Sequence, residues 1–88
     1  MIQPIRQLIH DGQTDEAIRQ LDALIAADRT QDEAFYLRGN AYRKQGNWQQ
    51  AINNYLEAME INPKSPAHGA YRMMIDILDF YDKDRYNQ

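Results

Sequence analysis

A step of 34 residues organises the sequence, and it is clearest between the glycines at positions 12 and 46. Four further pairs of small or apolar residues keep the same step: Ala17 and Ala51, Ile18 and Ile52, Leu21 and Tyr55, and Ile25 and Met59. A repeat of this length is too short to bury a core alone and must stack on its neighbours. The sequence therefore predicts a repeat array rather than a chain folded around one central sheet.

Turn and cap residues predict five helices. Gly12 and Gly46 can adopt the left-handed conformation that ends many helices, and Pro63 excludes helical geometry at the residue before it. The expected helices run from Pro4 to residue 11, from residue 14 onward, from a cap at 30 to 46, from a cap at 47 to 62, and from Ser65-Pro66 to about residue 82. No stretch alternates apolar and polar residues, so we predict an all-α, antiparallel helical-repeat array without strands.

Two of these helices begin with capping-box patterns. In this motif a side chain before the helix bonds a backbone N–H three residues on, which would otherwise lack a partner. Thr30 with Glu33 predicts such a box for the third helix, and Asn47 with Gln50 predicts one for the fourth.

Residues 32–65 resemble one complete tetratricopeptide repeat. Seven positions carry the small, aromatic and terminating residues of that family at its spacing: Phe35, Gly39, Tyr42, Ala51, Tyr55, Ala58 and Pro63. The resemblance implies two closely crossing helices, with Gly39 lying against Ala51 and Ala58. Arg38 departs from the pattern, since the family usually has leucine there.

The resemblance also implies a division of the chain. We expect a single domain over 1–88, with a partial repeat at 1–31, the complete repeat at 32–65, a capping helix at 66–83 and a short tail at 84–88. The stretch 12–31 keeps the pattern of a second repeat helix, although Arg29 stands where the terminating proline would be.

Composition excludes several functional classes. The net charge is -3, the pI is about 5.2, and there is no basic run. Nucleic acids and anionic membranes both require clustered lysine and arginine, so neither is an expected partner. The chain has no cysteine and no apolar segment of about 20 residues that could cross a membrane. We expect a soluble, cytoplasmic protein.

Catalytic and metal-binding patterns are missing from the sequence. His10 and His68 are far apart in the repeat frame, and neither has a partner at helical spacing that would complete a metal pair. Ser65 is the only serine and is expected to cap a helix, with no base nearby to activate it. We predict no enzyme activity, no metal and no cofactor.

In the family that the chain resembles, partners bind in a groove lined by the first helix of each repeat. By this resemblance the groove would present five side chains: Glu33, Tyr36, Asn40, Arg43 and Lys44. Asn40 matches an asparagine with which some members hold a C-terminal carboxylate. The basic partners of that clamp are absent, however, because its lysine and arginine positions are occupied here by Tyr36, Ala67 and Tyr71, which carry no positive charge. An acidic or aromatic segment is the expected groove ligand.

The fifth helix carries more apolar surface than an end helix needs. Helical spacing places one stripe against the body of the array, formed by Tyr71, Met74, Ile75 and Leu78. A second apolar group lies on another side of the helix: Met73, Ile77 and Phe80, with Tyr81 at its edge. Either the tail from residue 84 folds back over this patch, or the patch contacts a partner or a second copy.

These observations predict a non-catalytic module that binds a protein or peptide, through the groove or through the fifth helix. The first alternative is a homo-oligomerisation module, which would form a homodimer without another partner. The second is an RNA-binding helical repeat, which the acidic composition disfavours.

Overall fold

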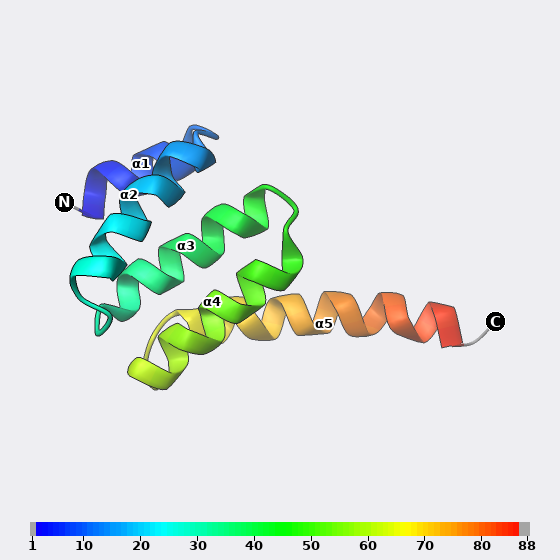
Figure 1. The fold of residues 1–88 in the computed structure, drawn as a ribbon. Helices are drawn as coiled ribbons and strands as arrows, with labels where there is room; N and C mark the ends of the chain where they lie inside the picture. The colour runs from blue at the N-terminus through cyan, green and yellow to red at the C-terminus, as the bar shows by residue number, and fades with distance from the viewer. Residues whose placement is uncertain (1, 87–88) are drawn as a thin grey trace.

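The computed structural model describes residues 2–86, with the side chains of residues 2–79. It contains five helices in this part of the chain: α1 (Ile2–His10), α2 (Thr14–Ala27), α3 (Asp32–Lys44), α4 (Trp48–Ile61) and α5 (Ala67–Tyr86). Successive helices run antiparallel as a chain of hairpins, and α5 passes α4 and extends beyond the other helices (Figure 1). The predicted all-α array is confirmed.

Each helix packs mainly on its neighbours in sequence, and α1 also reaches α3. The molecule is consequently elongated, with principal extents of 47 × 28 × 17 Å. This layout is expected of a repeat array, in which each unit buries its apolar face on the next.

Two identical turns mark the 34-residue step. Gly12 and Gly46 have φ angles of 86° and 81°, a region that favours glycine. In the first turn Gln13 N–H donates to the carbonyl of Leu8, and in the second Asn47 N–H donates to that of Tyr42. These backbone hydrogen bonds across the turn provide donors for carbonyls that the helix end would otherwise leave unpaired. The repeat in sequence is therefore a repeat in backbone geometry.

The N-terminal caps follow the predictions in part. The Asn47 side chain accepts a bond from the backbone of Gln50, as predicted. The capping box at Thr30 is wrong, because Thr30 bonds the carboxylate of Asp28 and the cap residue of α3 is Gln31, whose side chain makes no capping bond. Asp28 is two residues before Thr30 and reaches both its amide and its hydroxyl, and this local turn displaces the cap.

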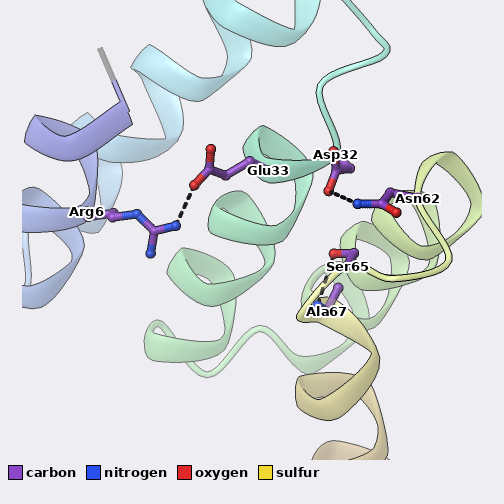
Figure 2. A network of polar contacts seen from close by, with 6 residues as sticks. All are labelled: Arg6, Asp32, Glu33, Asn62, Ser65 and Ala67. Atoms are coloured by element: carbon purple, nitrogen blue, oxygen red, sulfur yellow. Dashed lines mark hydrogen bonds and ion pairs between the residues drawn. The ribbon is translucent and has the colours of Figure 1, made fainter.

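The outer helices are longer than predicted. Helix α1 begins at Ile2, so Pro4 lies within the first turn, where its missing N–H needs no partner. Helix α5 begins at Ala67, whose amide donates to the Ser65 hydroxyl (Figure 2), and continues to Tyr86 instead of ending near residue 82. Residues 84–86 extend the helix and do not form a separate tail that folds back over it.

The core is a single cluster of apolar side chains from all five helices. Its fully buried members include Leu21, Phe35, Leu37, Tyr55 and Met74. Leu37 is buried, and it lies one residue before Arg38, which stands at the position where the family usually has leucine. Asn54 is also buried, and the apolar pattern gave no sign of it.

Gly39 lies at the crossing of α3 and α4, as predicted, but its neighbours differ in part. A Cβ atom on Gly39 would lie 2.6 Å from Cε1 of Tyr55 and 3.2 Å from the carbonyl oxygen of Ala51. Ala51 is therefore at the crossing, whereas Ala58 is not among the nearest groups. The Tyr55 ring fills the space that the missing side chain leaves, so glycine and tyrosine form one packing unit.

The first helix pair carries different residues at the positions that correspond to this crossing. One repeat step before Gly39 and Tyr55 stand Ile5 and Leu21, and both are buried. A larger side chain on the first helix is matched by a smaller one on the second. The summed side-chain size at these positions is therefore similar in the two pairs, although the residues differ.

Candidate peptide-binding face

The five residues predicted to line a groove lie along one side of α3, and we call this set the α3 face: Glu33, Tyr36, Asn40, Arg43 and Lys44. Their spacing of three and four residues brings them to the same side of the helix. The structure shows that they form three groups with different surroundings.

The ends of the α3 face are tied to α1. Glu33 in the first turn of α3 forms an ion pair with Arg6 at 2.5 Å (Figure 2). Near the other end, Lys44 Nζ donates to the backbone carbonyl of His10 at 3.1 Å. Both side chains therefore have partners within the fold and help to hold α1 against α3.

The middle of the face is built on Tyr55 of α4. The Tyr55 hydroxyl donates to Oδ1 of Asn40 at 2.5 Å, and the rings of Tyr36 and Tyr55 lie 6.1 Å apart and tilted by 40°. The ring of Tyr55 is buried, yet its hydroxyl reaches the side of α3 that carries Asn40. The tyrosine thus fills the helix crossing and orients the amide of the face.

Burial raises the pKa of the Tyr55 phenol to about 12, while the positive charge of Arg43 acts in the opposite direction. Removing water from the phenolate is unfavourable, and the neutral phenol keeps its bond to Asn40. The Tyr55 hydroxyl therefore belongs to a core residue and also interacts with Asn40 and Arg43 of the α3 face.

This shift predicts a loss of stability in alkali. The unfolded phenol ionises near pH 10 and the folded one near pH 12, so the contribution of Tyr55 is complete below pH 10 and is lost as the pH rises to 12. Urea unfolding followed by circular dichroism across this range should show the decline. The Tyr55→Phe variant should lack that part of the decline, and an unchanged pH dependence would contradict the assignment.

Arg43 is the part of the face that lacks an internal partner. Three arginines among the described side chains are half-buried: Arg6, Arg38 and Arg43. Arg6 pairs with Glu33 and Arg38 pairs with Asp22, whereas Arg43 forms no ion pair within the described residues. A half-buried guanidinium without a carboxylate is a candidate site for an anionic group from outside the molecule.

A cavity lies elsewhere, between α1 and α2. It has a volume of about 250 Å³ and is lined by Ile5, Arg19, Gln20, Ala23 and Leu24. None of the α3 face lines it. Arg19, its charged member, is engaged by Glu16 at 2.5 Å. The cavity therefore lacks the unpaired charge that marks the α3 face, and we base the candidate site on that charge.

The predicted patch on the last helix is described in part. Met73 and Ile77 are exposed, with 56% and 39% of their surface accessible, whereas Phe80 and Tyr81 lie outside the described side chains. Ile75 was assigned to the packing stripe, but 37% of it is exposed. The residues of α5 that pack on the core are Ala67, Ala70, Tyr71 and Met74, and Leu78 is half-buried.

Sequence reasoning missed the role of Tyr55 in the candidate site, because the repeat pattern assigned it to the core alone. The available signal was the hydroxyl, since a buried tyrosine needs a hydrogen-bond partner where phenylalanine does not. The described residues contain no cluster of three or more acidic, histidine or cysteine side chains placed to hold a metal ion. Among residues 2–86, no helix combines the length and apolar character that crossing a membrane requires.

Comparisons with known proteins agree with this architecture. The tetratricopeptide repeat family matches residues 32–65, the stretch that forms α3 and α4. The NMR solution structure of the Bacteroides fragilis protein BF1650 is similar over the whole chain, with 48% sequence identity, a TM-score of 0.88 and 90% of that protein covered. A comparison with curated proteins gave no significant match. The chain therefore contains a tetratricopeptide repeat, formed by residues 32–65.

Proposed function

We propose that this protein is a non-catalytic interaction module whose α3 face binds an acidic segment of a protein partner. The tetratricopeptide repeat at residues 32–65 suggests protein interaction in general. The observation that supports the specific proposal is Arg43, a half-buried cation without a carboxylate partner among the described side chains. Tyr36 and Asn40 precede it on the same side of the helix and add an aromatic surface and an amide.

The residues at the two ends of the α3 face bond α1 and are therefore not available to a ligand. Glu33 and Lys44 are engaged by α1. A carboxylate at Arg43 would be held by a charge-assisted bond, and the adjacent Tyr36 ring would cover apolar parts of the bound segment. Exposed ion pairs are weak because water and salt screen them. The partial burial of Arg43 reduces this loss.

Binding to an array of immobilised short peptides, with an acidic pair placed at each position, tests the proposal. The Arg43→Glu variant should bind the acidic peptides at least about tenfold more weakly, because it replaces attraction by repulsion. Tyr36→Ala should weaken the same peptides. Arg72→Glu is the matched control, since it makes the same charge change at an exposed site on α5. Acidic binding that persists in both α3 variants would eliminate this face.

A further inference from the structure

The exposed apolar residues of α5 lie on one flank of the helix. Met73 and Ile77 are one turn apart, so their side chains are adjacent along the helix surface. The stripe that packs on the body of the array is centred on Ala67 and Met74, which are fully buried. Exposed apolar side chains grouped in this way commonly mark a contact surface.

The packing of α3 on α2 shows which way this flank faces. Arg38 donates to Asp22 of α2, and Gln45 donates to Thr14 at the start of that helix. The side of α3 toward α2 therefore contains residues 38 and 45, and helical spacing adds the fully buried residues 34 and 41 to it. In α5 the fully buried Ala67 and Met74 and the half-buried Tyr71 and Leu78 repeat this spacing 33 residues later, one residue less than the 34-residue step of the sequence.

This correspondence relates the flank of α5 to the α3 face. Asn40 corresponds to Met73 and Lys44 corresponds to Ile77. Both α3 residues belong to the α3 face, so Met73 and Ile77 continue that face onto the next first-position helix of the array. By this register, the two surfaces that the sequence suggested separately occupy corresponding sides of α3 and α5.

The opposite flank of α5 has a different character. Gly39 of α3 lies against α4, and helical spacing brings Phe35 and Tyr42 to the same side of α3. Their counterparts 33 residues later are His68, Arg72 and Ile75. Two of these three are polar, so the flank is suited to water. The apolar surface of α5 is therefore concentrated on the side of the α3 face.

We infer that Met73 and Ile77 form an apolar subsite of the α3 face, which selects acidic segments that also carry a large apolar residue. The inference rests on the proposed function. Charge favours binding the acidic residue at α3 and the apolar residue at α5, because Asp76 of α5 occupies the position that corresponds to Arg43. An acidic residue is attracted to α3 and repelled from α5, while an apolar side chain is accommodated beside Met73 and Ile77.

The test uses peptides with a fixed acidic pair and a leucine stepped through the other positions, compared with the same peptides carrying serine. Wild-type protein should prefer leucine to serine at one spacing by at least about tenfold, which corresponds to 1.4 kcal/mol. Ile77→Ser should remove this preference and leave the affinity for serine peptides unchanged. Ile75→Ser is the matched control, since Ile75 has nearly the same exposure on the other flank.

The outcomes separate this inference from the function on which it rests. If Arg43→Glu loses all acidic binding, the proposed function is retained. If Ile77→Ser and Ile75→Ser then change the preference for leucine equally, the apolar subsite is overturned. Acidic binding that is insensitive to Arg43 would overturn both. If sedimentation shows that Ile77→Ser dissociates a dimer without altering peptide preference, the patch binds a second copy and the inference is wrong.

Discussion

The Gly39→Leu variant should lose about 3 kcal/mol of unfolding free energy, the largest effect we expect from a single substitution. Even the first added atom would lie within 2.6 Å of the Tyr55 ring and 3.2 Å of the Ala51 carbonyl oxygen. The ring cannot move aside easily, because it is fully buried and its hydroxyl is bonded to Asn40. Urea denaturation followed by circular dichroism measures the loss.

Two controls identify the cause of this loss. Gly69→Ala should be neutral or slightly stabilising, because a Cβ atom there meets nothing within 4 Å and alanine favours helices. The pair Gly39→Ile with Tyr55→Leu copies Ile5 and Leu21 of the first helix pair. It should cost less than the sum of its two single changes, because the smaller ring partner leaves room for the larger side chain. Strict additivity would show that the crossing does not set the cost.

The Arg38→Leu variant should be destabilised by about 1–3 kcal/mol, even though leucine is the usual family residue at this position. Arg38 Nε donates to Oδ1 of Asn54 at 2.7 Å, and its guanidinium lies 5.4 Å from the centre of the Phe35 ring. Asn54 is only 3% exposed, so losing this donor leaves a buried acceptor without a partner. Thermal and urea unfolding would both report the change.

Asn54 and Asp22 provide the tests of this explanation. Replacing both Arg38 and Asn54 with leucine should recover much of the lost stability, since no buried polar group then remains unpaired. Asp22→Ala should cost less than about 1 kcal/mol, because Asp22 is 55% exposed and its ion pair with Arg38 is screened. A larger cost for Asp22→Ala than for Arg38→Leu would assign the effect to the ion pair instead.

Much of this fold is predictable because its signals are local. A left-handed glycine ends a helix wherever it stands, and Gly12 and Gly46 show the repeat step without any knowledge of packing. The start of α3 was predicted less well. Several residues there could act as the cap, and the choice depended on whether Thr30 bonded Glu33 or Asp28.

The candidate site was less predictable, because its chemistry depends on pairs from different helices. The sequence alone could not show that Glu33 and Lys44 are engaged by α1 while Arg43 has no ion-pair partner among the described side chains. It also could not relate the exposed flank of α5 to the α3 face, since a shift of one residue in repeat register changes the side to which a helical residue points. Pairings across helices carry this information, and a single-sequence pattern does not.

The length of α5 has a consequence for how the molecule opens. This helix packs chiefly on α4, and its second half extends beyond the body, whereas α3 packs on α1, α2 and α4. In a linear array each unit is stabilised by its immediate neighbours, so an end unit can unfold while the others stay folded. Cooperative fluctuations should therefore begin at α5 and reach α3 last. The apolar subsite would then belong to the most readily exchanging segment, and the cation at Arg43 to one of the slowest.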